Sequence, residues 1–130
     1  MKLYTPEHYA DPTGAMAVAR VLGAPRFNAN REWPVVYICA PGDHRRYCRL
    51  AVGSGYLPVA PAIWFPQFLD LGDPTQRRIE EAFRKIMIGK CRQIWIFGDR
   101  VTDEMRLEIE HAKKRSVLVR HFTTDGEEIW

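Results

Sequence analysis

The sequence is poor in the residues that build disulfides and metal centres. Its three cysteines are Cys39, Cys48 and Cys91. They are odd in number and show none of the paired spacings of zinc sites, which indicates reduced structural thiols. The histidines His44, His111 and His121 likewise have no metal-binding spacing with cysteines or carboxylates. We therefore predict neither a metal ion nor a dissociable cofactor.

Long apolar runs and an excess of one charge are also missing. No apolar stretch reaches the length of a transmembrane helix, and residues 1–6 lack the apolar core of a signal peptide. The net charge is only +3, from 19 Lys and Arg against 16 Asp and Glu that are mixed along the chain. We therefore expect a cytoplasmic protein without a membrane partner, and the charge gives little support for a nucleic-acid partner.

What is present is the composition of a folded domain. A hydrophobic fraction of 46% and a charged fraction of 27% are typical of globular proteins, and 130 residues suit one domain. We divide the chain into an N-terminal extension (1–33), an α/β core (34–122) and a tail (123–130). The extension holds one predicted helix, which begins near Pro12 and ends at Gly23, followed by a loop.

Four short apolar runs have the composition of buried β-strands: residues 35–40, 56–60, 94–97 and 117–122. Start signals and apolar spacing predict helices over residues 43–53 or 43–55, 73–89 and 103–115. This alternation predicts a doubly wound parallel sheet of the flavodoxin-like or Rossmann-like class, with four main strands in the order 2-1-3-4. In that order a crevice opens beyond the carboxyl ends of strands one and three.

Apolar side chains are concentrated in the middle of the chain. The predicted helix 73–89 carries an apolar stripe that we expect to face the core: Ile79, Ala82, Phe83, Ile86 and Met87. The preceding stretch, 61–73, has no clean period and is predicted to be a loop, although it contains Trp64, Phe65 and Phe68. Two interpretations stay open for these rings: they stack on a nucleobase, or they fill the core or a subunit interface.

Glu108 is the most informative charged residue, because it shares a helix face with apolar residues. Offsets of three, four and seven residues connect Met105, Glu108, Ile109 and Ala112. A carboxylate in this position is either desolvated or lies at the lip of a pocket. The alternative is an ordinary surface glutamate that pairs with charges along the helix.

Two loops meet at the predicted crevice, one after each central strand. Segment 41–43 opens a helix where backbone amides and Arg45 can hold a phosphate or a sugar hydroxyl; the alternative is a solvated helix face capped by Asp43. After the other strand, Gly98 and Asp99 form a turn. Asp99 is either a second working carboxylate or a turn residue bonded to its own backbone.

Segments 36–41, 55–61, 65–69 and 95–112 resemble the nucleoside 2-deoxyribosyltransferase-like superfamily, and within it small uncharacterised phage and bacterial proteins. In the characterised enzymes of that superfamily, a helix glutamate attacks the anomeric carbon and an aspartate helps to protonate the departing base. The resemblance implies that Glu108 is the nucleophile, that Asp99 or Asp103 is the second carboxylate, and that Tyr37 lies near the nucleophile. It also implies a nucleoside or nucleotide as the bound small molecule, and a homo-oligomer.

The implied activity is N-glycosidic bond cleavage or base exchange on a (deoxy)nucleoside or nucleotide, with retention. Expected substrate contacts are Pro41, Gly42, Asp43, Arg45, Phe65, Gly98, Asp103 and Met105. Two departures from the superfamily pattern favour another class, a non-catalytic nucleotide-binding or sensing module: Glu110 replaces a glycine, and Glu104 with Met105 replaces a small Gly-Thr pair. A third class is an interaction protein of a mobile element, with the aromatic stretch as its interface.

Overall fold

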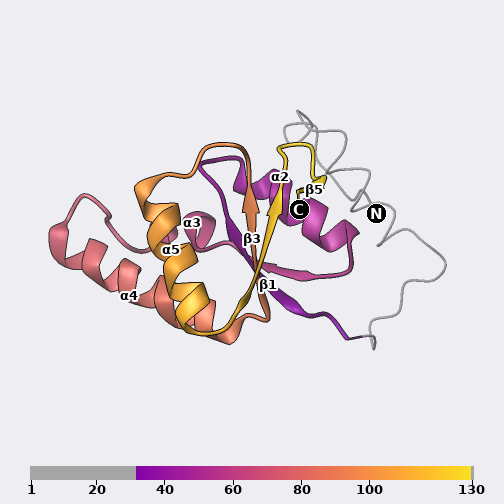
Figure 1. Ribbon diagram of the computed structural model, residues 1–130. Helices are drawn as coiled ribbons and strands as arrows, with labels where there is room; N and C mark the ends of the chain where they lie inside the picture. Colours follow the sequence, from indigo (N-terminus) through magenta and orange to yellow (C-terminus); the bar gives the residue numbers. More distant parts are fainter. Residues whose placement is uncertain (1–31, 130) are drawn as a thin grey trace, which may run out of the picture.

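The computed structural model describes residues 32–129 (Figure 1). The predicted N-terminal helix lies outside the described residues. The elements are β1 (Val35–Cys39), α2 (His44–Gly53), β2 (Leu57–Val59), α3 (Pro61–Trp64), η2 (Phe65–Gln67), α4 (Pro74–Lys90), β3 (Gln93–Phe97), α5 (Asp103–Lys114), β4 (Leu118–Phe122) and β5 (Glu128–Ile129). Within residues 32–129, none of the helices combines the length and the apolar character needed to span a membrane.

The strands form one sheet in the order β2-β1-β3-β4-β5. The first four are parallel to their neighbours, which confirms the predicted doubly wound sheet and its order 2-1-3-4. β5 is antiparallel to β4, with Ile129 opposite His121 and Glu128 opposite Phe122. The sequence prediction of a tail after β4 missed this strand, because two residues are too few to show a periodic pattern.

Alternate side chains of the two central strands divide the core into two layers. One layer contains Val36, Ile38, Trp95 and Phe97 together with Tyr47 and Ala51 of α2. The other contains Tyr37, Cys39, Ile94 and Ile96 together with Ile88 of α4 and Met105 and Ala112 of α5. Figure 1 shows α4 and α5 on one side of the sheet and α2 on the other. Both faces are therefore covered, as the unbroken apolar runs of the strands indicated.

The two helices beside the cavity described below, α4 and α5, each begin at a residue whose side chain caps the helix. The Asp73 carboxylate accepts a hydrogen bond from the Gln76 backbone N–H at 3.0 Å, at the start of α4. The Thr102 hydroxyl accepts one from the Met105 backbone N–H at 3.1 Å, at the start of α5. These bonds satisfy amides that the helix itself leaves without a partner, so the Asp73 and Thr102 side chains set where the two helices start.

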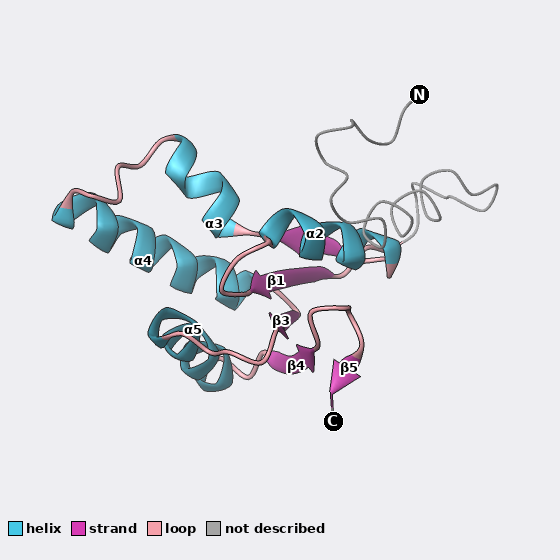
Figure 2. Ribbon diagram, turned by 90° about the horizontal axis from the view of Figure 1, so that it is seen from above, coloured by secondary structure: helices cyan, strands magenta, loops and turns pink. Residues whose placement is uncertain are grey.

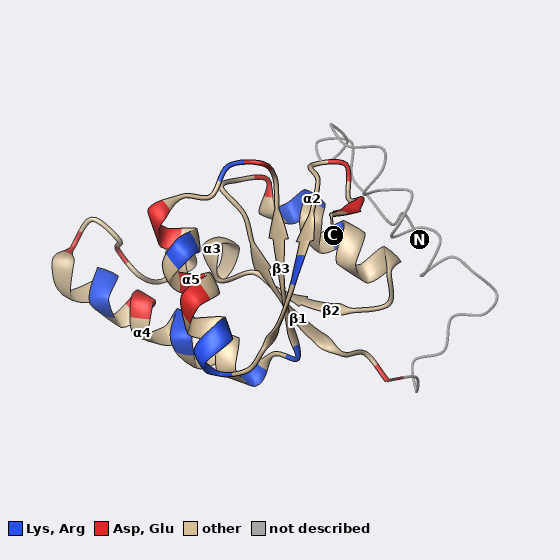
Figure 3. Ribbon diagram, viewed as in Figure 1, with Lys and Arg blue, Asp and Glu red and all other residues tan. Residues whose placement is uncertain are grey.

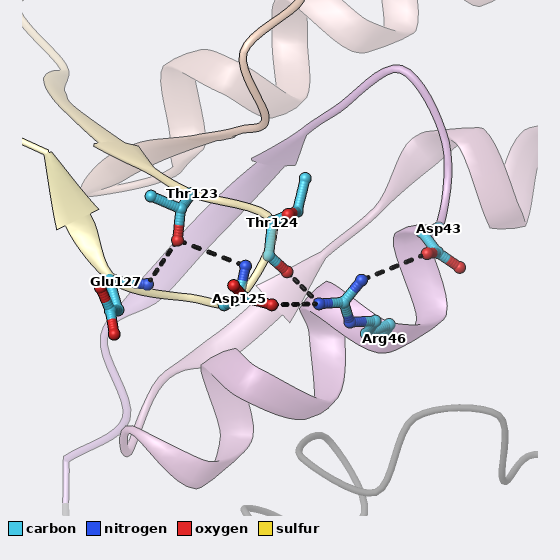
Figure 4. Close-up of polar contacts among 6 residues, drawn as sticks. All are labelled: Asp43, Arg46, Thr123, Thr124, Asp125 and Glu127. Atoms are coloured by element: carbon cyan, nitrogen blue, oxygen red, sulfur yellow. Dashed lines mark hydrogen bonds and ion pairs between the residues drawn. The ribbon is translucent and has the colours of Figure 1, made fainter.

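The start of α2 is tied to the β4–β5 turn and is not capped as predicted. Asp43 has a left-handed φ of 59° and its side chain makes no capping bond, so the predicted cap is wrong. Its carboxylate instead lies 3.5 Å from Arg46. The Arg46 guanidinium also donates to the Thr124 carbonyl and lies 3.8 Å from Asp125 (Figure 4). One arginine thereby connects the first turn of α2 to the far end of the chain.

The aromatic stretch between β2 and α4 is more ordered than the predicted loop. It forms the short helices α3 and η2, with Pro61 in the first helical position of α3. Phe65 is buried, and its ring packs against those of Trp64, Phe68 and Phe83 at centroid distances of 5.2, 6.0 and 5.5 Å. The rings pack against α4, and this packing stabilises two short helices that the sequence shows no periodic pattern for.

Candidate active site

A cavity of about 500 Å³ opens beyond the carboxyl ends of β1, β2 and β3. The segments that follow these strands contribute Pro41, Pro61 and Thr102 to its wall, and α4 and α5 contribute Arg84 and Glu108. Figure 2 shows α4 and α5 on one side of β1 and β3, as the walls of the cavity require. Its volume lies in the range of small-molecule sites, at the place where a doubly wound sheet binds ligands.

Glu108 presents its carboxylate to this cavity from α5, with 13% of the side chain exposed. The Tyr37 hydroxyl of β1 donates a hydrogen bond to Oε2. The Cys39 thiol, two residues further along the same strand, lies 3.7 Å from Oε1. Each carboxylate oxygen therefore has its own donor from β1, and the two contacts fix the plane of the carboxylate.

An arginine of α4 completes the group. Arg84 Nε lies 2.9 Å from a Glu80 oxygen, and Arg84 Nη1 lies 3.9 Å from Glu108 Oε2. The Glu80 and Arg84 side chains are 8% and 15% exposed. One guanidinium thus lies between two nearly buried carboxylates, and the charge of each is partly balanced by it.

The sequence prediction missed Arg84 and Glu80 because it placed the opposite face of α4 against the core. It assigned the stripe of Ile79, Phe83 and Ile86 to the core, whereas these side chains are 38, 38 and 53% exposed. The signal that could have found the pair is the spacing of a glutamate four residues before an arginine, which puts both on one face of a helix.

The protonation behaviour of the group follows from its burial. Burial raises the pKa of the Glu108 carboxyl, although the Tyr37 hydrogen bond and the Arg84 charge act against this rise. Burial and the nearby Glu108 charge raise the pKa values of the Tyr37 hydroxyl and the Cys39 thiol, so both remain protonated donors. Burial also raises the pKa of Glu80, against the opposing effect of Arg84.

Five of the eleven predicted catalytic and substrate-contact residues line this cavity: Tyr37, Pro41, Asp103, Met105 and Glu108. They come from β1, from the loop that follows it and from α5. Met105 is buried beneath the wall, and Asp103 is exposed and forms a 3.1 Å ion pair with Arg106. Of the two aspartates considered as the second carboxylate, Asp103 is the one that reaches the cavity.

The other six lie outside the cavity wall: Gly42, Asp43, Arg45, Phe65, Gly98 and Asp99. Asp99 is exposed in the turn after β3, and Gly98 provides that turn with its φ of 96°. Phe65 is buried among aromatic rings, and Asp43 faces Arg46 as described above. Of the loop after β1, Ala40 and Pro41 line the cavity while Gly42 and Asp43 do not, and the wall continues with His44 at the start of α2.

Comparison with known proteins matches residues 34–122 to one protein family. The match runs from the residue before β1 to the end of β4, so it includes the whole parallel sheet and every wall of the cavity. A search of curated proteins found no match to the chain. The matched segment is well over half of the sequence, and the chain therefore belongs to the family described as domain of unknown function DUF7768.

Proposed function

We propose that this protein cleaves the N-glycosidic bond of a (deoxy)nucleoside or nucleotide, or exchanges its base, with Glu108 as the nucleophile. The observation that carries the proposal is a nearly buried carboxylate, held by Tyr37 and Cys39, at the wall of a cavity large enough for a nucleoside. The resemblance of β1, β3 and α5 to deoxyribosyltransferase-like enzymes supports the same chemistry.

In the proposed reaction, a Glu108 oxygen forms a bond to the anomeric carbon of the sugar. The bond from that carbon to the base breaks, and its electron pair leaves with the base. Water or a second base then opens the glycosyl ester and returns the Glu108 carboxylate. Because each of the two displacements inverts the anomeric carbon, the overall reaction proceeds with retention.

The neighbours of Glu108 act as positioning residues. Only the ionised carboxylate attacks, and burial alone favours the neutral form. The Tyr37 hydrogen bond and the Arg84 charge stabilise the anion, and Glu80 holds Arg84 in place. These contacts offset part of the effect of burial and so favour the ionised, reactive carboxylate.

We further propose a cytoplasmic homo-oligomer that joins through the exposed apolar face of α3, η2 and α4. This face consists of Trp64, Phe68, Ile79, Phe83 and Ile86, all at least 38% exposed. Exposed apolar patches of this kind mark protein contacts. The three cysteines are free thiols, which suits a reducing compartment.

The test is an assay of the pure protein with a panel of ribo- and deoxyribonucleosides and their 5′-monophosphates. Base release and base exchange are followed by chromatography, for the wild type, for Glu108→Gln and for the control Glu110→Gln. Glu110 is an exposed carboxylate two residues along the same helix. We expect turnover in the wild type and in the control, and a loss of turnover of about 10³-fold or more in Glu108→Gln. Mass spectrometry of wild-type protein quenched during turnover should show an added mass equal to one sugar, from the covalent glycosyl-enzyme.

Turnover that survives in Glu108→Gln would contradict the nucleophile assignment. A second candidate function is a non-catalytic nucleotide-binding module, and the position of Asp99 outside the cavity wall favours it. That function predicts equal ligand binding by the wild type and by Glu108→Gln in calorimetry, without base release in either.

A further inference from the structure

The wall of the cavity is rich in carboxylates and poor in available cations. Its five acidic residues are Glu80, Glu81, Asp103, Glu104 and Glu108. Its two guanidinium groups are those of Arg77 and Arg84. The remaining basic side chain of the wall is His44, and burial lowers its pKa, which favours the neutral imidazole at neutral pH. The acidic start of α5 is visible in Figure 3.

Both guanidinium groups already have partners within the protein. Arg84 lies between Glu80 and Glu108, at 2.9 and 3.9 Å. Arg77 is exposed and donates its Nε–H to the Leu71 carbonyl at 3.0 Å, and no ion pair involves it within residues 32–129. A phosphate group in this cavity would have to compete with two carboxylates for Arg84, and it would meet five acidic residues against two arginines.

Two acidic side chains of the wall remain available for a cation. Glu81 and Glu104 are exposed, and neither forms an ion pair within residues 32–129. They approach the same region from different helices, since Glu81 of α4 and Glu104 of α5 line the cavity together. We call Glu81 and Glu104 the rim of the cavity: their charges favour a cation on the cavity side, whereas Lys85 and Lys114 line the neighbouring hollow between the same two helices.

The residues of the cavity wall also limit which kind of base can leave, because a neutral base needs a proton donor. Burial raises the pKa of the Glu80 carboxyl, but this group is held by Arg84, and Asp103 is exposed and paired with Arg106, so neither is positioned to give a proton to a departing base. A neutral base leaves as an anion and needs such a donor, whereas a base with a fixed positive charge does not. When its glycosidic bond breaks, the electron pair neutralises the ring, and the base departs as a neutral molecule.

On the basis of the proposed function, we propose that the substrate is a nucleoside with a positively charged base and no 5′-phosphate, such as an N-glycosylated pyridinium. Glu108 forms the bond to the anomeric carbon as the carbon–nitrogen bond breaks. Water then adds its oxygen to that carbon, loses its proton to solvent and releases the carboxylate. The carboxylates of the rim hold the cationic ring before this step.

The experiment compares substrates that differ in charge. Nicotinamide riboside and its 2′-deoxyriboside are assayed against inosine and 2′-deoxyinosine, and nicotinamide riboside against its 5′-monophosphate. We expect kcat/KM to be at least about tenfold higher for the cationic nucleosides than for the neutral ones, and to fall by about tenfold with the phosphate. The preference should weaken as salt is added.

Variants of the rim test the source of the preference. In the double variant Glu81→Gln with Glu104→Gln, we expect about a fivefold loss of kcat/KM for nicotinamide riboside and no change for inosine. Glu127→Gln, which removes an exposed carboxylate between β4 and β5, outside the cavity wall and the hollow between α4 and α5, should change neither. Equal losses for charged and neutral nucleosides would show that the rim does not select charge, and would overturn the inference.

Failure of this inference is distinguishable from failure of the proposed function. Faster cleavage of inosine, or better cleavage of the 5′-monophosphate, would overturn the inference and leave the glycosidic reaction standing. If no base is released, the proposed catalysis is wrong, and calorimetry of the folded protein tests the inference by itself. Tighter binding of nicotinamide riboside than of inosine would still support selection of a positively charged base. Equal or absent binding removes both.

Discussion

At the scale of single residues, the central feature is a carboxylate on which two opposing effects act. Burial raises the pKa of Glu108, while the Tyr37 hydrogen bond and the Arg84 guanidinium lower it. A hydrogen bond to a charged group stabilises it by about 1.5–3 kcal/mol, so one donor can decide whether the anion is available near neutral pH. The Tyr37 hydroxyl is therefore the contact whose removal is most informative.

Tyr37→Phe removes this donor and keeps the ring in the core. We expect the carboxyl pKa to rise further, so the acidic limb of kcat/KM moves to higher pH and activity at pH 6 falls about tenfold or more. A pH profile of base release on the preferred nucleoside checks this. Tyr56→Phe, which removes a hydroxyl on the opposite face of the sheet, should leave the profile unchanged. A uniform loss at all pH values would assign Tyr37 to another role.

Glu108 also makes stability depend on pH in a defined direction. Its folded-state pKa lies above the unfolded value, so the carboxyl costs nothing below the unfolded pKa, and stability is lost as pH rises through the folded pKa. Glu108→Gln stays neutral at every pH. We expect its Tm to exceed that of the wild type by a few degrees at pH 7, and to equal it near about pH 4. Calorimetric scans at both pH values measure the difference, and a lower Tm at pH 7 would contradict the assignment.

At the scale of elements, α4 carries two faces of different use. The inner face presents Glu80, Arg84 and Ile88 to the cavity and the core, and the outer face leaves Phe83 and Ile86 exposed. Apolar spacing alone could not distinguish these faces, because a polar face is turned inward only when its charges balance each other. The helix therefore positions the charges of the site and also provides a surface for contact.

Arg84→Met tests the inner face. It leaves the Glu80 and Glu108 carboxylates nearly buried without a cation, and we expect a loss of about 2–3 kcal/mol in the free energy of unfolding at pH 7. The loss should shrink at pH 5, where protonation of the carboxyls removes the charge that Arg84 balances. Urea unfolding at both pH values measures it. Arg78→Met, an exposed change on the same helix, should cost little; a loss independent of pH would mean that packing, not charge, is the cause.

Ile86→Glu tests the outer face. If α4 joins subunits of the proposed homo-oligomer, a charge at this 53% exposed position costs the interface an unpaired carboxylate and shifts the protein to monomers. Sedimentation of both proteins over a range of concentrations measures this shift. Glu81→Gln, which adds no charge on the same helix, should not dissociate the oligomer. A wild type that is monomeric at all concentrations would contradict the proposed interface.

At the scale of the whole molecule, the parallel sheet was predictable and its finer parts were not. Unbroken apolar runs such as that of β3 indicate strands covered on both faces, and the alternation of strands with helices predicts the order of the strands in the sheet. The position of Glu108 at the wall of a pocket was predictable, because this acidic residue interrupts an apolar helix face. The spacing of Glu80 and Arg84 places both on one face of a helix, but whether that face turns inward depends on how α4 packs in space, as the exposure of Asp99 depends on how the β3 turn packs.

The two faces of the sheet also have different roles, since one carries the charged site and the other carries aromatic packing. The layer under α2 is apolar and aromatic, with the Phe97 ring 4.0 Å from that of Tyr47 and 5.2 Å from that of Phe122. The charges of the site lie in the other layer. Phe97→Leu should therefore lower the free energy of unfolding by about 1–2 kcal/mol without changing ligand affinity per folded molecule. Met105→Ala, in the layer under the cavity, should change both. Denaturant unfolding and ligand titration on the same samples measure the two effects, and a parallel loss of affinity in Phe97→Leu would show that the layers are coupled through the sheet.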